Sequence, residues 1–463
     1  MKRLFPMMVV VVLLVGAVSV ATAQARVRNY VVLAPSENSL PSGLLQEIRA
    51  AGGTVTEAMP EIGVAVVSSA NPNFASRVRG ARSVVPSINL RWLQPVEHIE
   101  LTNVTDPPNS TEDDVLFNLQ WGHDAVNSHN AWARGVRGDG VRVAVLDTGF
   151  LTNHPDLAPN INLALSHSFV PDEPLQYNMA LDPDQFSHGS HVAGIIAAAD
   201  NGIGTIGVAP EAELVLVKVL SDSGSGDFDW VISGIYHAAN VDADIINMSL
   251  GTVLDLRGGC DDPEDPETCY TTRDVVELIV AMSRATHYAY RQGSTIIASA
   301  GNDAINFDRN PFLIDLPAMA PHVIAISATA PIGWAVDPET NLDVPTSYTN
   351  TGRLIVDFAA PGGDALYPGD EGCTVAGVSA PCWVFDLVLS TTNSLSGGPG
   401  YAWAGGTSMA APHASGVAAL LMSKHGGDMH PLLVALQLAL YADDLGSRGF
   451  DPIYGLGRVS AVR

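Results

Sequence analysis

Basic residues are scarce in this sequence, because 23 Lys and Arg stand against 49 Asp and Glu and the formal net charge is −26. The deficit is uneven along the chain. Residues 1–95 hold nine basic and four acidic side chains, a balance of +5, so residues 96–463 carry −31. A body this acidic repels polyanions, which argues against binding to nucleic acid or to anionic membranes. It could instead attract cations, or the basic N-terminal part of the chain.

Long apolar runs are also missing, apart from one at the N-terminus. Residues 4–20 form an apolar stretch that follows Lys2 and Arg3 and precedes small residues at 21–25. The pattern is typical of a secretory signal peptide, here 1–23, although an uncleaved membrane anchor is the alternative. No other run approaches the roughly 20 residues of a spanning helix. We therefore expect a secreted, extracellular protein with no membrane anchor after signal cleavage.

Cysteine is rare, and the four cysteines include no Cys-x-x-Cys spacing of the kind that binds zinc. In an exported chain they favour disulfides, for which three connectivities exist. Cys260 and Cys269 flank an acidic loop, and Cys373 and Cys382 flank a second loop of equal length. The two local pairs are the favoured connectivity. The acidic loop could hold calcium, but a solvated loop is the simpler interpretation.

The chain divides into regions of different pattern. Residues 26–95 read as strand, helix, strand, strand, helix, strand, which is typical of a small split βαβ module. Residues 96–112 show little periodicity and are interpreted as an exposed linker. In residues 113–463 strands and helices alternate, which predicts an α/β fold with a mostly parallel sheet and helices on both faces.

Polar side chains fall at the ends of several expected strands. The strands are expected at 141–146, 214–220, 245–248, 295–298, 323–328 and 354–358, with helices at 188–199, 230–239 and 275–292. Asp147, Ser249 and Asn302 come at the carboxyl ends of three of these strands. Because ligands of parallel sheets bind beyond that edge, these residues are candidates for one site.

Four residues supply the groups of nucleophilic serine catalysis. The reaction needs a nucleophile, a base, an acid that orients the base, and donors for the oxyanion. Ser408 lies among small residues at the start of an apolar helical run, which leaves its hydroxyl accessible. His188, Asp147 and Asn302 are candidates for the other roles. Each alone has an ordinary alternative, such as a helix cap or a turn, but their joint occurrence favours catalysis.

Three segments resemble the signature blocks of the subtilisin-like serine proteases. They are 145–149 (Val-Leu-Asp-Thr-Gly), 188–194 (His-Gly-Ser-His-Val-Ala-Gly) and 406–413 (Gly-Thr-Ser-Met-Ala-Ala-Pro-His). Secondary blocks agree at 247–251, 300–302 and 359–362. The chain order Asp, His, Ser is that of subtilisin. The resemblance covers residues 113–463, and Ser190 departs from it where the family usually has threonine.

The resemblance implies roles for the candidate residues. Ser408 would attack the peptide carbonyl, His188 would carry the proton to the leaving amine, and Asp147 would orient His188. The Asn302 side chain and the Ser408 backbone N–H would hold the oxyanion. The backbone of Ser249, Leu250 and Gly251 would bind an extended substrate next to the specificity pocket.

The resemblance also implies a partner and a cofactor. Residues 26–95 resemble the inhibitory propeptide of these enzymes, so we expect a self-processing precursor of a monomeric secreted endopeptidase that acts on proteins or peptides. Segments around Asp156 and Asn201 resemble those of a family calcium site, and Asp113 matches an N-terminal ligand. Oxygen ligands of this kind suit Ca²⁺.

Three other functions remain as alternatives. A peptide-binding protein without activity is disfavoured, since relatives that lose activity usually lack a catalytic residue and none is missing here. A metallohydrolase using His188, His191 and Asp147 lacks the His-Glu-x-x-His helix, and His191 is interpreted as structural. A lipase-type esterase is disfavoured because Ala410 breaks Gly-x-Ser-x-Gly and the chain order of the triad differs.

Overall fold

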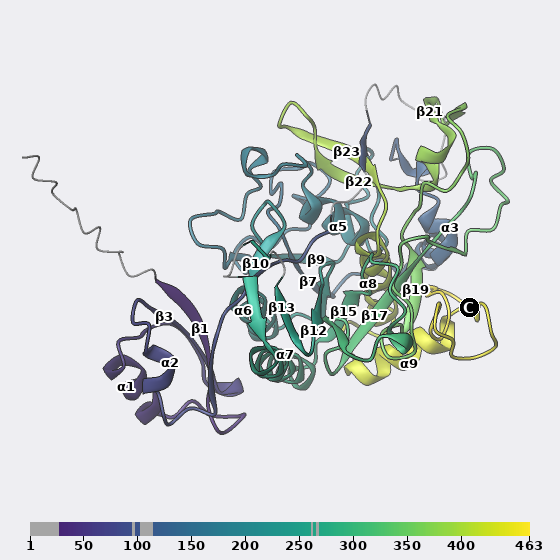
Figure 1. Cartoon of the computed structure of the whole chain (residues 1–463). Helices are drawn as coiled ribbons and strands as arrows, with labels where there is room; N and C mark the ends of the chain where they lie inside the picture. Colours follow the sequence, from purple (N-terminus) through teal and green to yellow (C-terminus); the bar gives the residue numbers. More distant parts are fainter. Residues whose placement is uncertain (1–26, 95–97, 102–113, 261–262, 265–267) are drawn as a thin grey trace, which may run out of the picture.

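The computed structural model describes residues 27–94, 98–101, 114–260, 263–264 and 268–463 (Figure 1). The predicted signal peptide and Asp113 therefore lie outside the described residues. Within the described ranges, the structure holds no helix that is both long and apolar enough to cross a membrane.

A mostly parallel sheet forms the centre of the larger domain. In the described part of the chain it has eight strands, and β19 (Phe358–Pro361) pairs with β17 beside the main path. Along that path the order is β18 (Val344–Pro345), β17 (Val323–Ala330), β15 (Thr295–Ser299), β11 (Ile245–Met248), β7 (Arg142–Asp147), β9 (Glu213–Lys218) and β8 (His167–Ser168). All of these neighbours are parallel except β17 and β18. The predicted mostly parallel sheet is confirmed.

Helices cover both faces of this sheet, as predicted. On one face Val143 and Val145 of β7 pack into the cluster that contains α5 (His188–Ala197) and α8 (Thr407–Ser423). On the other face Ala144 and Leu146 pack with α6 (Phe228–Asn240) and α7 (Thr272–Gln292). Successive side chains of a strand alternate between its two faces, so one apolar strand contributes side chains to the hydrophobic core on each side of the sheet.

Shorter elements surround the sheet. They are α3 (Gly122–Val126), α4 (Ser128–Trp132), α9 (Pro431–Tyr441), β6 (His98–Glu100), β12 (Thr252–Asp255), β16 (Leu313–Leu316), β22 (Val388–Asn393) and β23 (Pro399–Ala404). Strand β6 lies within the predicted exposed linker, where the structure differs from expectation because β6 pairs with β23. Ile99 packs against an apolar cluster there, which accounts for its ordering.

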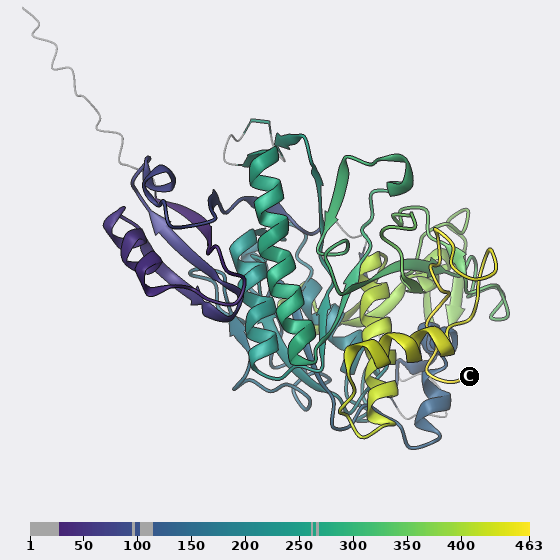
Figure 2. The ribbon, with the colours of Figure 1, turned by 90° about the horizontal axis from the view of Figure 1, so that it is seen from below.

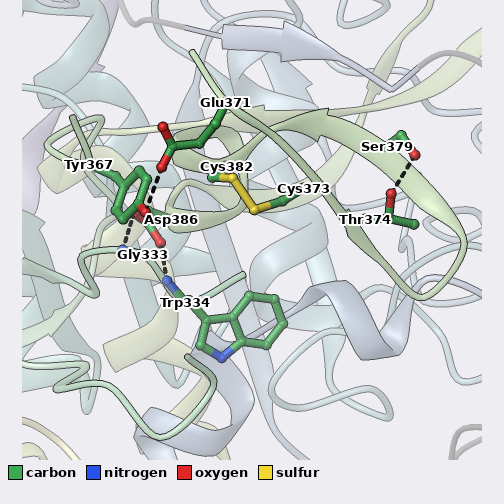
Figure 3. Close-up of a disulfide and its surroundings, with 9 residues drawn as sticks. All are labelled: Gly333, Trp334, Tyr367, Glu371, Cys373, Thr374, Ser379, Cys382 and Asp386. Carbon is green, nitrogen blue, oxygen red and sulfur yellow. Dashed lines mark hydrogen bonds between the residues drawn. A yellow bond between two sulfur atoms is a disulfide. The ribbon is translucent and has the colours of Figure 1, made fainter. Parts of the chain in front are cut away.

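Two hairpins carry the disulfides. Strands β13 (Gly258–Cys260) and β14 (Cys269–Thr271) are joined by Cys260–Cys269, and β20 (Gly372–Val375) and β21 (Val378–Pro381) by Cys373–Cys382. The favoured local pairing is confirmed. Figure 3 shows the second disulfide near the buried carboxylate of Asp386, which accepts hydrogen bonds from the backbone of Gly333 and Trp334 at 2.7 and 2.8 Å. These two hydrogen bonds connect the loop that contains Gly333 and Trp334 to the segment that follows the hairpin.

One predicted strand is wrong. Residues 354–357 form a turn that leads into β19, which begins at Phe358. In this turn Ile355 and Val356 donate backbone hydrogen bonds to the Gly352 carbonyl. Ile355 and Val356 are buried in a small cluster with Phe307, whereas Leu354 is exposed. The apolar run is therefore buried by a turn, which periodicity cannot distinguish from a short strand.

A separate four-stranded antiparallel sheet precedes the larger domain. Its elements are β1 (Arg28–Leu33), α1 (Ser42–Ala50), β2 (Thr54–Met59), β3 (Val64–Ser69), α2 (Phe74–Arg77) and β4 (Ser83–Pro86), and the strand order is β2-β3-β1-β4. This is the predicted sequence of strands and helices. One face packs against α1 and α2, and the other lies along α6 and α7 (Figure 2).

The contact between the two domains combines apolar packing, hydrogen bonds and ion pairs. Val31 and Leu33 join the same apolar cluster as residues of α6 and α7. The guanidinium of Arg284, on the acidic body, donates to the carbonyls of Ala34 and Gly63 at 3.0 Å each. The attraction of a basic segment to an acidic body, expected from composition, is represented here by such an ion pair, since Arg82 lies 3.1 Å from the Glu277 carboxylate.

Candidate active site

An aspartate and a histidine meet at the carboxyl edge of the parallel sheet. Asp147 is the last residue of β7 and His188 is the first of α5. The Nδ1 of His188 lies 2.8 Å from Oδ1 of Asp147, and both side chains are buried. A carboxylate accepts, so Nδ1–H donates, and in the neutral form of the ring Nε2 is then the nitrogen with the lone pair. This Nε2 has no hydrogen-bond partner among the described residues.

Ser408 lies at the start of α8, and the chain segment beside it is the one that also lies beside His188. Leu93 and Gln94 line both the cavity beside His188 and the cavity beside Ser408. The Ser408 hydroxyl donates to the carbonyl of Ser249 at 3.1 Å. The hydroxyl must turn away from the Ser249 carbonyl before it can donate to His188. Hydrogen bonds between a catalytic serine and its base often form only when substrate is bound.

Asn302 is oriented by the turn that precedes α8. Its Oδ1 accepts from the Thr407 backbone N–H at 2.9 Å and from the Thr407 hydroxyl at 2.7 Å. Because both contacts use the oxygen, the Nδ2 donors are available on the other side of the amide. Asn302 and Ser408 line one cavity, so these donors and the Ser408 N–H can serve the same oxygen.

The chain's own residues 89–94 pass through this cleft as an extended segment. Strand β5 (Asn89–Arg91) pairs antiparallel with β10 (Ser225–Asp227). The Gly251 N–H donates to the Trp92 carbonyl at 3.0 Å, and the indole N–H of Trp92 donates to Gly226 at 2.8 Å. The segment therefore lies between two backbone edges, as an added strand does.

Three further histidines are held by backbone carbonyls. His191, His154 and His413 contact the carbonyls of Ala402, Gly400 and Met409 at 2.9, 3.0 and 2.8 Å. Burial lowers the pKa of His191 to about 3 and those of His154 and His413 to about 4. They are neutral packing residues, which agrees with the structural interpretation of His191.

Two buried carboxylates lie together near α5. Asp114 accepts from the Asn201 backbone at 3.3 Å, and Asp156 accepts from the Thr205 backbone at 3.1 Å. One oxygen of each, Asp114 Oδ2 and Asp156 Oδ1, has no hydrogen-bond partner among the described residues. Burial raises the pKa of Asp114 to about 7 and that of Asp156 to about 6.

This arrangement fits a hard cation. Unpaired buried carboxylate oxygens are costly unless a positive charge compensates them, and Ca²⁺ prefers such oxygens. The described residues contain no group of three or more His, Cys, Asp or Glu suited to a metal, so backbone and amide oxygens would have to complete the set. The sequence predicted Asp113 as a ligand and not Asp114; Asp113 lies outside the described residues, so its prediction as a ligand stands beside Asp114.

An α/β sheet that places Asp147, His188 and Ser408 at one edge defines the class of subtilisin-like serine proteases. The subtilase family model matches residues 138–457, and the chain belongs to that family. It is 33% identical to subtilisin E of Bacillus subtilis over 295 residues, 63% of this chain and 58% of that protein's length. It is 31% identical to the thermostable alkaline protease of Halalkalibacterium halodurans over 390 residues, 78% of this chain and 86% of that protein.

Solved structures show the same fold. The epidermin leader peptide processing serine protease of Staphylococcus aureus matches with a TM-score of 0.68 and 22% identity, over 94% of this chain and 97% of that chain. Fervidolysin of Fervidobacterium pennivorans matches with a TM-score of 0.64 and 23% identity, over 95% of this chain and 61% of that chain. The predicted subtilisin-like fold is confirmed.

Proposed function

We propose that the chain is a secreted, monomeric serine endopeptidase that hydrolyses peptide bonds in proteins through an acyl-enzyme. The observation that carries the proposal is the Asp147–His188 hydrogen bond. His188 Nε2 has no partner among the described residues, and His188 lines a cavity together with the chain's own extended segment. In the family, Asp, His and Ser at these positions perform acyl transfer.

Each step has a residue to perform it. Ser408 Oγ bonds to the peptide carbonyl carbon while His188 Nε2 takes the hydroxyl proton. Asp147 stabilises the resulting imidazolium. Asn302 Nδ2 and the Ser408 N–H hold the oxyanion. His188 then gives the proton to the leaving amine, the C–N bond breaks, and water releases the acyl group in the same manner.

Labelling with a fluorophosphonate tests this proposal directly. The reagent should modify Ser408 and abolish casein hydrolysis in the same proportion. The assay should contain calcium, because its loss could unfold the protein and mimic inhibition. Mass spectrometry should locate the label on the peptide that contains Ser408. Labelling elsewhere, or casein hydrolysis that survives complete labelling, would contradict the proposal.

The N-terminal domain, residues 26–95, is proposed as an inhibitory propeptide. Its last residues lie in the cleft between Gly226 and Gly251, where a substrate would bind, and Trp92 is buried there against Phe228 at 4.7 Å between ring centroids. A segment held in this way blocks other peptides until the chain is cut and the domain leaves. N-terminal sequencing of the mature protein would locate the cut.

We expect the contact between this domain and α6 to weaken as the pH rises. Burial raises the pKa of Glu57, while the hydrogen bond from the Ser233 hydroxyl and the nearby His167 lower it by a smaller amount. Burial also raises the pKa of Asp229 from 3.8 to about 7, with Asp227 and Glu57 adding to the effect and the Ser87 hydroxyl opposing it. An acid whose pKa is higher when it is buried stabilises the buried form at pH values below its ordinary pKa. This stabilisation is lost as the pH rises toward 7, because the buried acid must then ionise or become exposed.

Hydrogen exchange of the Ser408→Ala chain would measure this change. Protection of the amides of β1 and β3, corrected for intrinsic rates, should be lower at pH 8 than at pH 5. Glu57→Gln should reduce the difference, and Glu47→Gln, on α1 away from the contact, should not. Equal protection at both pH values would contradict the expectation.

Calcium is proposed as a structural cofactor at the carboxylate pair. Asp114 and Asp156 would supply carboxylate oxygens and Asn201 its amide oxygen, so that the cation compensates charge that burial otherwise makes costly. Asp113 remains a predicted ligand outside the described residues.

Added calcium is expected to raise the melting temperature. At about 100 times Kd, binding to the folded state alone stabilises it by about 2.7 kcal/mol. Asp156→Asn should remove most of the shift, whereas Asp370→Asn, an exposed acid on a distant loop, should leave it intact. Differential scanning calorimetry with and without a chelator measures both. A melting temperature that is insensitive to calcium in all three proteins would refute the site.

A further inference from the structure

One cavity beside Ser408 contains a carboxylate that the mechanism does not use. The cavity has a volume of about 240 Å³ and is lined by Ser408, Asn302, Gly251, Gly301 and Asp315. Since the proposed nucleophile and oxyanion donor form one wall, the cavity receives the side chain of the residue whose carbonyl is attacked. Its chemistry therefore selects the residue on the N-terminal side of the cut bond.

Asp315 is fully enclosed beside this cavity. It lies in β16, opposite Val253 of β12, and only 1% of it is exposed. A Cβ atom at Gly251 would lie 2.9 Å from Asp315 Oδ1, and one at Gly301 would lie 2.8 Å from Asp315 Oδ2. Both glycines thus leave room for the carboxylate, next to the Gly251 N–H that holds the bound peptide.

The Asp315 carboxylate lacks a basic partner among the described residues. Its Oδ1 has no hydrogen-bond partner, and no ion pair joins Asp315 to a basic side chain in the described part of the chain. Burial raises its pKa well above the ordinary range, and the nearby charge of Asp303 raises it further. A buried acid without a partner is destabilising, so its retention at a binding cavity suggests a partner that arrives with the ligand.

The peptide present in the cleft does not supply that partner. Gln94 donates its side-chain amide to Asp303 Oδ1 at 2.6 Å, at the more exposed side of the cavity. Asp303 also accepts from the Asn350 side chain at 3.2 Å, so its carboxylate is already hydrogen-bonded. Asp315, farther inside, is left for a longer side chain with a positive end.

We propose that Asp315 makes this protein selective for lysine or arginine immediately before the cut bond. The inference rests on the proposed function, with Ser408 as nucleophile. A cationic side chain entering the cavity forms a charge-assisted hydrogen bond with the carboxylate, whereas an apolar side chain leaves the acid unpaired. A site built to pair with a polar group rejects analogues that lack it.

Fluorogenic peptides that differ only at this residue test the proposal. With the enzyme obtained by expressing the full chain, kcat/KM for lysine or arginine should exceed that for norleucine by about 10–100-fold, the value of a hydrogen bond to a charged group. Norleucine matches lysine in length but lacks the charge, so this comparison needs no variant. A preference for norleucine, leucine or phenylalanine would overturn the proposal.

Two variants separate Asp315 from the general acidity of the cavity. Asp315→Asn should lower the lysine-to-norleucine ratio of kcat/KM by about 10–100-fold, and Asp303→Asn should lower it much less. Equal losses in both would overturn the role of Asp315. If Asp315→Asn does not fold, benzamidine offers a second test, since it should inhibit the unmodified enzyme competitively with lysine peptides, and failure to do so would count against the proposal.

The outcome is distinguishable from a failure of the proposed function. If the fluorophosphonate labels Ser408 and the enzyme hydrolyses all of the peptides equally, only the proposed selectivity is refuted. A protein that is neither labelled nor active on any peptide would instead refute the serine endopeptidase function.

Discussion

Replacing Ser408 by alanine is expected to lower kcat on casein by about 10⁶-fold, the size of effect known for subtilisin. The hydroxyl is the proposed nucleophile, and alanine leaves His188 with no proton to accept and no acyl-enzyme to form. The same chain should remain uncut between its N-terminal sheet and the larger domain, because self-processing uses the same hydroxyl. Gel electrophoresis and N-terminal sequencing of the variant, expressed in a protease-deficient host, measure this.

Ser423→Ala is the matched control for this substitution. Ser423 lies at the last position of α8 and donates to Asp139 at 2.8 Å, far along the helix from Ser408. This variant should be processed and active. If the Ser408→Ala chain were processed in isolation or still cleaved casein, a different residue would have to be the nucleophile.

Replacing Asp147 by asparagine is expected to lower kcat by about 10⁴-fold with little change in fold. The Asp147 carboxylate accepts from His188 Nδ1 at 2.8 Å and from the Thr148 backbone at 2.7 Å. An amide at this position can present N–H to the ring, which would then carry its proton on Nε2. His188 in that tautomer cannot accept the serine proton.

Kinetics and calorimetry together distinguish this loss from unfolding. The Asp147→Asn protein should keep a melting temperature close to that of the unmodified chain and should react slowly with the fluorophosphonate. Activity within tenfold of the unmodified protein would show that Asp147 does not set the tautomer of His188.

The candidate site could be predicted because its parts are local. Asp147, His188 and Ser408 each lie in a short segment of glycine and small residues, and those segments carry the family resemblance. The strand that leads to Asp147 was recognisable because a strand buried on both faces gives a continuous apolar run, here residues 143–146. The structural role of His191 was also expected, and its contact with the Ala402 carbonyl supports it.

Other parts could not be predicted because they depend on contacts between distant segments. Asp114 lies beside Asp156 although 41 residues separate them in the sequence, and nothing in its local pattern indicates that contact. The turn at 354–357 has the composition of a strand, and only its backbone hydrogen bonds to Gly352 distinguish it from one.

By itself, the sequence determined most strands of the central sheet and which residues can perform acyl transfer, since these properties follow from short-range pattern and side-chain chemistry. The tertiary structure decided which groups meet. It inserted Trp92 between Gly226 and Gly251, and it buried Asp315 beside Ser408 although 92 sequence positions separate them. Such meetings depend on the register of strands and the packing of whole layers, which are properties of the entire chain rather than of any one segment.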